Sequence, residues 1–140
     1  MTWTLHAQLA ADTTVVGDFP LSRLLLSNDA NYPWCILVPR ITGAKELHRL
    51  DDADQLQVLR ESVALAHAME AVFKPHKMNV AALGNVVPQL HIHHIARYRT
   101  DAAWPAPVWG KHPAQAYLPV QLAERTSLLQ QALPGLMPPT

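Results

Sequence analysis

Apolar and polar positions along the first third of the chain alternate between short β-prone runs and turns. Apolar residues dominate 21–27 and 34–38, and the segment between these runs is rich in Asn, Asp and Pro, which form turns. A shorter β-prone stretch lies at 13–16, and the 34–38 run stops at Pro39. The pattern predicts two antiparallel strands joined by a turn, preceded by a shorter strand.

The clearest predicted helix runs from Asp51 to about Lys74. Asp51 or Asp52 can cap it, and Asp52 with Gln55 has the spacing of a capping box. Pro75 ends it, because proline cannot donate the next backbone hydrogen bond. The apolar positions that recur at intervals of three or four predict one buried face, made of Leu56, Leu59, Val63, Ala66, Met69 and Phe73.

The apolar runs, glycines and prolines in the second half of the chain predict two more strands and a final helix. Residues 78–83 form one apolar run, Gly84 breaks it, and 86–96 form the next. The proline-rich stretch 100–119 predicts an irregular segment, and Pro119 can open a helix that reaches about Leu133. Strands, one long helix, further strands and a tail are typical of an α+β fold, not of regular βαβ units.

Length and composition indicate a single globular domain. The chain has 140 residues, of which 49% are hydrophobic, which is enough to bury a core. We expect one domain over 1–140, with its core at about 20–110 and a Pro/Trp-rich C-terminal tail at 100–140. Cys35 is the single cysteine, so an internal disulfide framework and a four-cysteine zinc site are excluded.

Charge and hydropathy argue against nucleic-acid and membrane partners. Lys plus Arg equals Asp plus Glu at 11 each, which leaves no net charge to attract a polyanion or an anionic membrane surface. No apolar run approaches the ~20 residues that span a bilayer. The N-terminal residues lack the basic start and apolar stretch of a signal peptide, so we expect a cytoplasmic protein.

Three of the eight histidines fall within four residues, in the predicted strand 86–96. Side chains on a strand alternate between its two faces, with neighbours on one face ~6–7 Å apart. One face therefore carries Gln89, His91, His93 and Ile95. The other, mostly apolar, face carries Leu90, Ile92, His94 and Ala96, and we expect His94 to be structural or interfacial. The first face presents an amide and two imidazoles in a row.

Two neighbouring imidazoles suit chemistry at phosphorus. A neutral imidazole has a lone pair on one ring nitrogen and an unperturbed pKa of about 6.5, so it is a competent nucleophile near neutral pH. The second imidazole can give a proton to the leaving group or hold a phosphate oxygen. Two other interpretations remain open: His91 and His93 could be metal ligands, although no third ligand follows at a fixed spacing, or they are ordinary polar groups of a partly exposed strand.

Residues 89–95 resemble the conserved motif of the histidine triad (HIT) superfamily of nucleotide hydrolases and transferases. That motif is His-φ-His-φ-His-φ-φ, where φ is apolar, and the chain reads Gln89-Leu90-His91-Ile92-His93-His94-Ile95. His91 matches the family's nucleophile, which forms a covalent nucleotidyl-histidine. His93 matches the third position, which supports the phosphate and the leaving group.

The resemblance continues on both sides of the motif and covers roughly residues 20–110. Trp34–Pro39 followed by Arg40 resembles a family strand that ends Val-Ile-Pro-Lys, and Trp104-Pro105 resembles a Trp-Pro pair of one branch. The segment Gly84-Asn85-Val86-Val87-Pro88 resembles the family's Gly-Gln-Ser/Thr-Val turn. Three departures stand out. Gln89 replaces the first histidine, and Val86 replaces a Ser or Thr whose hydroxyl contacts phosphate in many members. His94 occupies a position of the motif that is apolar in the family.

The resemblance implies a set of substrate-binding residues around the two imidazoles. Asn28 and Asp29 lie where the family binds the ribose hydroxyls, and Asn79 would contact the phosphate or the ribose. Gly84 and Asn85 would approach the phosphate. Gln89 can still donate and accept hydrogen bonds and would orient the site, although it cannot titrate.

The implied protein is a HIT-like α+β domain, an antiparallel sheet with one long helix packed on it, expected to form a homodimer. The implied activity is hydrolysis of a nucleoside phosphate derivative, such as a dinucleoside polyphosphate or a nucleoside phosphoramidate, through a nucleotidyl-histidine. His91, His93 and Gln89 would be the catalytic residues, and no metal or other cofactor is expected. A nucleotide-binding module without turnover, and a transferase that uses an acceptor other than water, stay open as alternatives.

Overall fold

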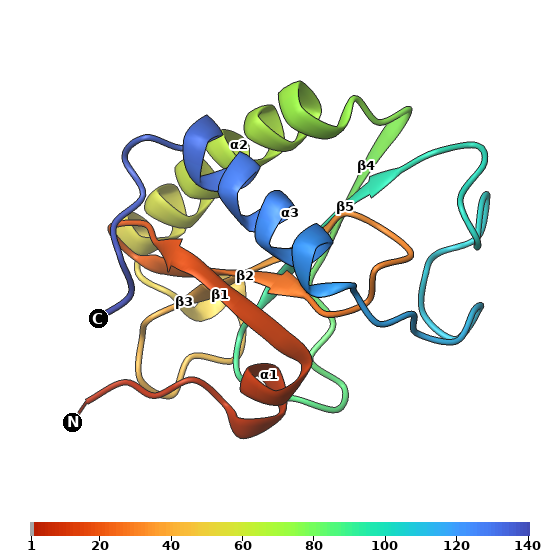
Figure 1. Cartoon of the computed structure of the whole chain (residues 1–140). Helices are drawn as coiled ribbons and strands as arrows, with labels where there is room; N and C mark the ends of the chain where they lie inside the picture. The colour runs from red at the N-terminus through yellow and green to blue at the C-terminus, as the bar shows by residue number, and fades with distance from the viewer. Residues whose placement is uncertain (1) are drawn as a thin grey trace.

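A five-stranded antiparallel sheet organises the chain (Figure 1). The structure is a computed structural model and describes residues 2–140. The strand order is β1-β2-β3-β5-β4. The strands are β1 (Thr13–Asp18), β2 (Ser22–Ser27), β3 (Trp34–Pro39), β4 (Lys77–Ala81) and β5 (Ile92–Arg97). The helices are α1 (Ala7–Asp12), the short 3₁₀ helix η1 (Leu47–Arg49), α2 (Asp52–Phe73) and α3 (Pro119–Ala132). The predicted α+β architecture, an antiparallel sheet with one long helix packed on it, is confirmed.

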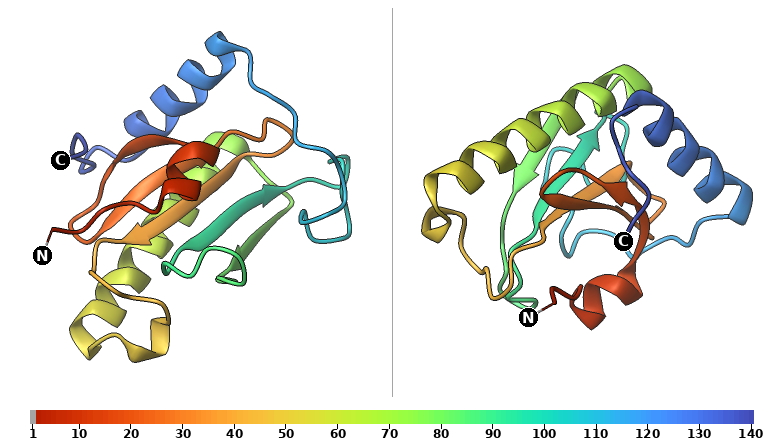
Figure 2. Two further views of the ribbon diagram at one scale, coloured as in Figure 1. Left: turned by 90° about the horizontal axis from the view of Figure 1, so that it is seen from below. Right: turned by 90° about the vertical axis from the view of Figure 1, so that its left-hand side faces the viewer.

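The two faces of the sheet have different covers. Helices α2 and α3 lie over one face, α2 on the β4–β5 side and α3 on the β1 side, while the N-terminal segment and α1 lie at the other face (Figure 2). Strand alternation sorts the core accordingly: Leu24 and Leu26 pack under the helices, and Leu25 packs with Leu9 on the opposite face. We call these the helix face and the open face.

The predicted buried face of α2 is correct at Met69 and Phe73 and wrong in the first half of the helix. Leu56, Leu59 and Val63 are exposed, and the residues that pack against the sheet are Val58, Glu61, Leu65, Ala68 and Met69. The buried face of this helix includes polar groups with partners on the sheet, so the spacing of apolar residues alone does not locate it. The N-cap is Asp51, whose carboxylate accepts from the Asp54 backbone N–H at 2.8 Å, instead of the Asp52 capping box.

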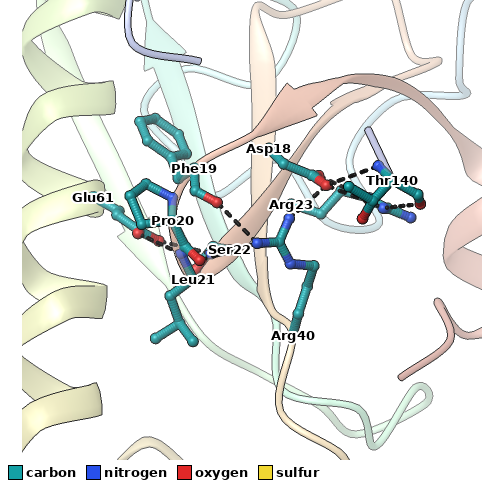
Figure 3. A network of polar contacts seen from close by, with 9 residues as sticks. All are labelled: Asp18, Phe19, Pro20, Leu21, Ser22, Arg23, Arg40, Glu61 and Thr140. Carbon is teal, nitrogen blue, oxygen red and sulfur yellow. Dashed lines mark hydrogen bonds and ion pairs between the residues drawn. The ribbon is translucent and has the colours of Figure 1, made fainter. Parts of the chain in front are cut away.

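Glu61 anchors α2 to the turn between β1 and β2 (Figure 3). Its buried carboxylate accepts hydrogen bonds from the backbone N–H groups of Leu21 and Ser22, each at 2.8 Å. Next to this turn, the buried Asp18 carboxylate pairs with the guanidinium groups of Arg23 and Arg40. The charges in this region are therefore matched, which is the condition for burying them at acceptable cost.

The outer edge of β1 is occupied by the C-terminal part of the chain. Met137 exchanges both backbone hydrogen bonds with Asp18, at 2.7 and 2.9 Å, and the Gln130 side chain donates to the carbonyl of Val16. Gly17 makes this approach possible, because a Cβ there would lie 2.7 Å from the side chain of Leu136. Within the predicted tail 100–140, α3 forms as expected and contributes Leu129 to the core under the helices.

The strand that carries the histidines starts later than predicted. β5 begins at Ile92, and residues 86–91 approach it as a loop. The backbone N–H of Leu90 donates to the carbonyl of Ala44, and the Gln89 side chain bonds the N-terminal segment, so neither residue enters the sheet ladder.

None of the helices between residues 2 and 140 is both long and apolar enough to cross a membrane.

Candidate active site

A cavity of about 730 Å³ lies on the open face of the sheet. Its floor is formed by β3 and β5, one wall by α1, and another by the loop that carries Gly84. Apolar and aromatic side chains dominate its lining, namely Leu9, Trp34, Ile36, Leu83, Val86, Val87 and Trp109. A few polar groups converge with them, as is usual for small-molecule sites. We call it the larger cavity.

His91 and His93 both line the larger cavity, and their ring centroids are 5.0 Å apart. Only 7% and 6% of their surfaces are exposed, so the rings are nearly enclosed by protein. Nδ1 of His91 lies 2.6 Å from the main-chain carbonyl of Gln89. Because a carbonyl can only accept, Nδ1 carries the proton, and in the neutral ring the lone pair is on Nε2.

His93 is held in the opposite tautomer. Its Nδ1 lies 2.9 Å from the indole Nε1 of Trp34, which can only donate. Nδ1 therefore accepts, and Nε2 carries the proton. The two imidazoles thus offer complementary groups to a ligand: a lone pair on His91 and an N–H donor on His93.

The pKa of His93 is lowered to about 4, first by burial and then by the neighbouring His91 and His94 rings. At neutral pH the ring is uncharged, which fits a hydrogen-bond donor and not a cation. His94 points to the helix face, where Nε2 lies 2.6 Å from the Ser62 hydroxyl of α2. It does not line the larger cavity, in keeping with the structural role expected for it.

Two tryptophans, which the sequence did not indicate as site residues, line the larger cavity. Trp34 donates to His93 as described, and the ring of Trp109 lies 5.0 Å from the His93 ring and 5.7 Å from that of Trp34. Trp109 comes from the proline-rich segment 100–119, which the sequence predicted only as irregular. Nothing in the local pattern of β3 distinguishes Trp34 from its apolar neighbours.

Gln89 acts through two different groups. Its main-chain carbonyl holds Nδ1 of His91, whereas its side-chain amide leaves the cavity and binds the N-terminal segment. The amide oxygen accepts from the His6 backbone N–H at 2.9 Å, and the amide nitrogen donates to the Thr4 carbonyl at 3.0 Å. The side chain therefore ties the segment before α1 to the loop that carries His91.

Asn28 and Asp29 line the larger cavity, as do Gly84 and Asn85. One carboxylate oxygen of Asp29 accepts from the backbone N–H groups of Asn31 and Gln115, while Oδ2 has no hydrogen-bond partner among residues 2–140. Gly84 has φ of 77°, which suits glycine and turns the loop back toward β5. Four of the five expected substrate-binding residues thus surround the two imidazoles.

Asn79 is the fifth, and the structure does not bring it to the cavity. Its side-chain oxygen accepts from Arg97 at 2.8 Å. Arg97 is 1% exposed and forms an ion pair with Asp101, so its charge is buried and already paired within the protein. Asn79 therefore supports a buried charge network beside β5.

Nowhere in residues 2–140 do three His, Cys, Asp or Glu side chains gather closely enough to hold a metal ion. His91 and His93 each spend one ring nitrogen on a protein partner.

We expect the protein to lose stability between pH 6.5 and pH 4. Burial lowers the pKa of both His93 and His94 to about 4, against 6.5 for an unperturbed histidine, so the unfolded chain binds up to two more protons in this window. Each histidine then removes about 3 kcal/mol of stability by pH 4. Buried Asp101, with its pKa lowered to about 2, keeps its charge throughout. Urea unfolding between pH 4 and 7 measures the effect.

Exposed His67 on α2 provides the control for this pH dependence, because a His67→Gln variant should keep the same profile. A free energy of unfolding that stays constant from pH 6.5 to pH 4.5 contradicts the proposed burial of two neutral imidazoles.

Comparison with known proteins places this geometry in context. The model of the HIT domain family matches residues 8–100. A histidine triad protein from Marinobacter aquaeolei superposes with a TM-score of 0.93 at 49% identity, covering 97% of this chain and 99% of that one. One from Bradyrhizobium japonicum also gives 0.93, at 45% identity, covering 94% and 98%. A diadenosine triphosphate hydrolase from Plasmodium falciparum shares the fold at 16% identity, with a TM-score of 0.60 over 96% and 83%. No curated protein sequence matches the chain.

Proposed function

The chain belongs to the HIT domain family, a family of nucleotide hydrolases and transferases, and we propose that it hydrolyses a nucleoside phosphate derivative through a nucleotidyl-histidine on His91. The observation that carries the proposal is the pair of opposite tautomers on His91 and His93. A nucleophile and a phosphate-oxygen donor, 5.0 Å apart between ring centroids, meet at one cavity wall.

The larger cavity fits a nucleoside. Its apolar and aromatic lining suits a base, and the free Oδ2 of Asp29 can accept from a ribose hydroxyl. Asn28 lies beside Asp29, and its side chain is held by the Thr14 hydroxyl at 2.9 Å. A nucleoside bound this way brings its 5′-phosphate to the wall formed by His91 and His93.

The first chemical step transfers the nucleotidyl group to the protein. The Nε2 lone pair of His91 forms a P–N bond to the α-phosphorus, and the P–O or P–N bond to the leaving group breaks, with the bonding pair going to the leaving group. A phosphate leaves as its anion, whereas a phosphoramidate nitrogen takes a proton from solvent and leaves as ammonia. The Nε2–H of His93 donates to a phosphate oxygen and stabilises the added charge of the transition state. A carbonyl partner on Nδ1 holds the His91 ring in place and stabilises the positive charge that it gains.

Water completes the second step. It attacks the phosphorus of the nucleotidyl-histidine, the P–N bond breaks, and the pair returns to Nε2 of His91, while the proton of water goes to solvent or to the departing phosphate. Gly84 and Asn85 line the same cavity, and their backbone N–H groups would take the place of the hydroxyl that Val86 lacks. The products are a nucleoside monophosphate and the free leaving group.

A turnover assay with the purified chain tests the proposal. Diadenosine triphosphate and adenosine 5′-phosphoramidate are incubated separately with the protein, and release of AMP is followed by chromatography. Radiolabelled adenylate should be trapped on the protein after an alkaline quench and lost in acid, because P–N bonds of phosphohistidine are acid-labile. Tight binding without AMP supports a binding module, and product that forms only with a second acceptor supports a transferase. Either result overturns the hydrolase.

We also propose a homodimer built on the β4 side of the sheet. β4 is an edge strand, and Val80 on it is 53% exposed. Above it, α2 presents the apolar residues Leu56, Leu59 and Val63 to solvent, at 54%, 59% and 47% exposure. An open strand edge beside an exposed apolar helix face is a surface that proteins usually cover.

A Leu59→Asp variant should be monomeric, because it places a charge in the centre of this exposed helix face. Sedimentation equilibrium should give twice the chain mass for the unchanged protein and one chain mass for the variant. Leu118→Asp, at an equally exposed position before α3, serves as the control and should stay dimeric. A monomeric unchanged protein overturns this part of the proposal.

A further inference from the structure

A second cavity adjoins the nucleophile from the other side of the Gly84 loop. It measures about 450 Å³ and lies between the segment 45–48, which includes the first two residues of η1, and the loop 82–91. Its lining shares three residues with the larger cavity, namely Leu83, Gly84 and His91. We call it the smaller cavity. The two cavities therefore meet at the proposed nucleophile.

The two cavities differ in charge. Among the described residues that line the larger cavity, the carboxylates are Asp12 and Asp29, and none is Lys or Arg. The smaller cavity is lined by Lys45 and His48 with one carboxylate, that of Glu46, and it has no aromatic residue apart from the histidines. An anionic group is therefore favoured in the smaller cavity over the larger one.

We infer that the smaller cavity holds the phosphate chain of the leaving group, with Lys45 as its main cationic contact, so that the substrates are nucleoside or dinucleoside polyphosphates and not phosphoramidates. This inference rests on the proposed function. Nucleoside and leaving group are both attached to the phosphorus that His91 attacks, so their sites must adjoin at His91, as these two cavities do.

Gly84 leaves room for the phosphate chain of a substrate to pass between the two cavities. A Cβ at this position would meet the Val87 carbonyl at 3.6 Å and nothing nearer, so the space above the glycine is open. His91 lies at the same junction, and its Nδ1 is held by Gln89, which itself lines the smaller cavity. A phosphate chain that crosses Gly84 thus keeps its α-phosphorus beside the nucleophile.

A comparison of two substrates with different leaving groups tests the inference. Diadenosine triphosphate releases the anion ADP, and adenosine 5′-phosphoramidate releases uncharged ammonia. Lys45→Ala should lower kcat/KM for the first substrate about tenfold, the effect of one charge-assisted hydrogen bond, and lower it for the second less than about twofold. Lys111→Ala removes the same charge from an exposed position outside both cavities and should affect neither substrate.

Equal losses for both substrates, or no loss for diadenosine triphosphate, overturn the inference. Turnover of the phosphoramidate alone by the unchanged protein also overturns it, while the proposed hydrolase stands.

Binding decides the matter if neither substrate is turned over. Calorimetry compares AMP with adenosine α,β-methylenediphosphate, whose P–C–P bridge cannot be cleaved. The unchanged protein should bind the diphosphate analogue about tenfold more tightly than AMP, and Lys45→Ala should abolish the difference. Equal affinities in the unchanged protein, or a difference that survives in Lys45→Ala, overturn the inference independently of any turnover.

Discussion

His91→Ala should abolish turnover, with kcat/KM reduced at least about 10³-fold, because the variant has no group that can form the covalent bond to phosphorus. The labelled adenylate adduct should disappear as well. Binding of AMP should persist, since the larger cavity supplies the base and ribose contacts through other residues. AMP release, adduct trapping and calorimetry on one preparation separate these effects.

Two further variants make this result specific. His67→Ala changes an exposed histidine of α2 and should leave turnover intact. Trp34→Phe keeps an aromatic ring but removes the N–H that fixes the tautomer of His93, so kcat should fall about 10-fold to 100-fold, as when the partner of an oriented histidine is lost. Turnover that survives in His91→Ala, with circular dichroism unchanged, means that another group is the nucleophile.

Asp101→Ala should destabilise the protein by about 3–5 kcal/mol, a large part of the 5–15 kcal/mol that typically holds a domain together. Arg97, 1% exposed, would lose its ion-pair partner, and three backbone N–H groups, those of Tyr98, Ala103 and Trp104, would lose their acceptor. Burial alone would raise the pKa of Asp101, but these contacts outweigh it and lower the pKa to about 2. Urea unfolding at pH 7 measures the loss.

The double variant Arg97→Met/Asp101→Ala tests the cause. Removing both charges avoids an unpaired buried guanidinium, so the double variant should be more stable than Asp101→Ala alone. Glu124→Ala, at an exposed position of α3, should change the free energy of unfolding by less than about 0.5 kcal/mol. A single variant with near-native stability contradicts the buried network.

The sequence located those elements whose signals are local. Turn residues on both sides of 34–38 bound a strand, and Asp51 and Pro75 bound a helix, so β3 and α2 lie where they were predicted. The order of strands and helix was enough for the fold class. His91 and His93 share one cavity, as the predicted alternation required, although His91 directly precedes β5 and is not part of it.

The remaining features depend on contacts between distant residues. Glu61 and Ser62 face the sheet because their partners are there, and this turns α2 away from the face that its leucines indicated. Gln89 leaves the strand because the residues at 4 and 6 bind its amide, 85 and 83 positions away. Trp34 meets His93 across 59 residues, a pairing that hydropathy does not encode.

The C-terminal segment that lies along β1 limits how far the five-stranded sheet can be extended by other molecules. The outward backbone groups of Asp18 and the carbonyl of Val16 already have partners from the C-terminal part of the same chain, whereas β4 has none from a further strand. If two molecules join through β4 as proposed, their outer edges are the two β1 strands, on which the groups of Asp18 and Val16 already have partners, so addition of a third molecule there is disfavoured. In such a dimer Gly17, which leaves room for Leu136 and Met137 beside β1, would help to limit growth to a closed pair.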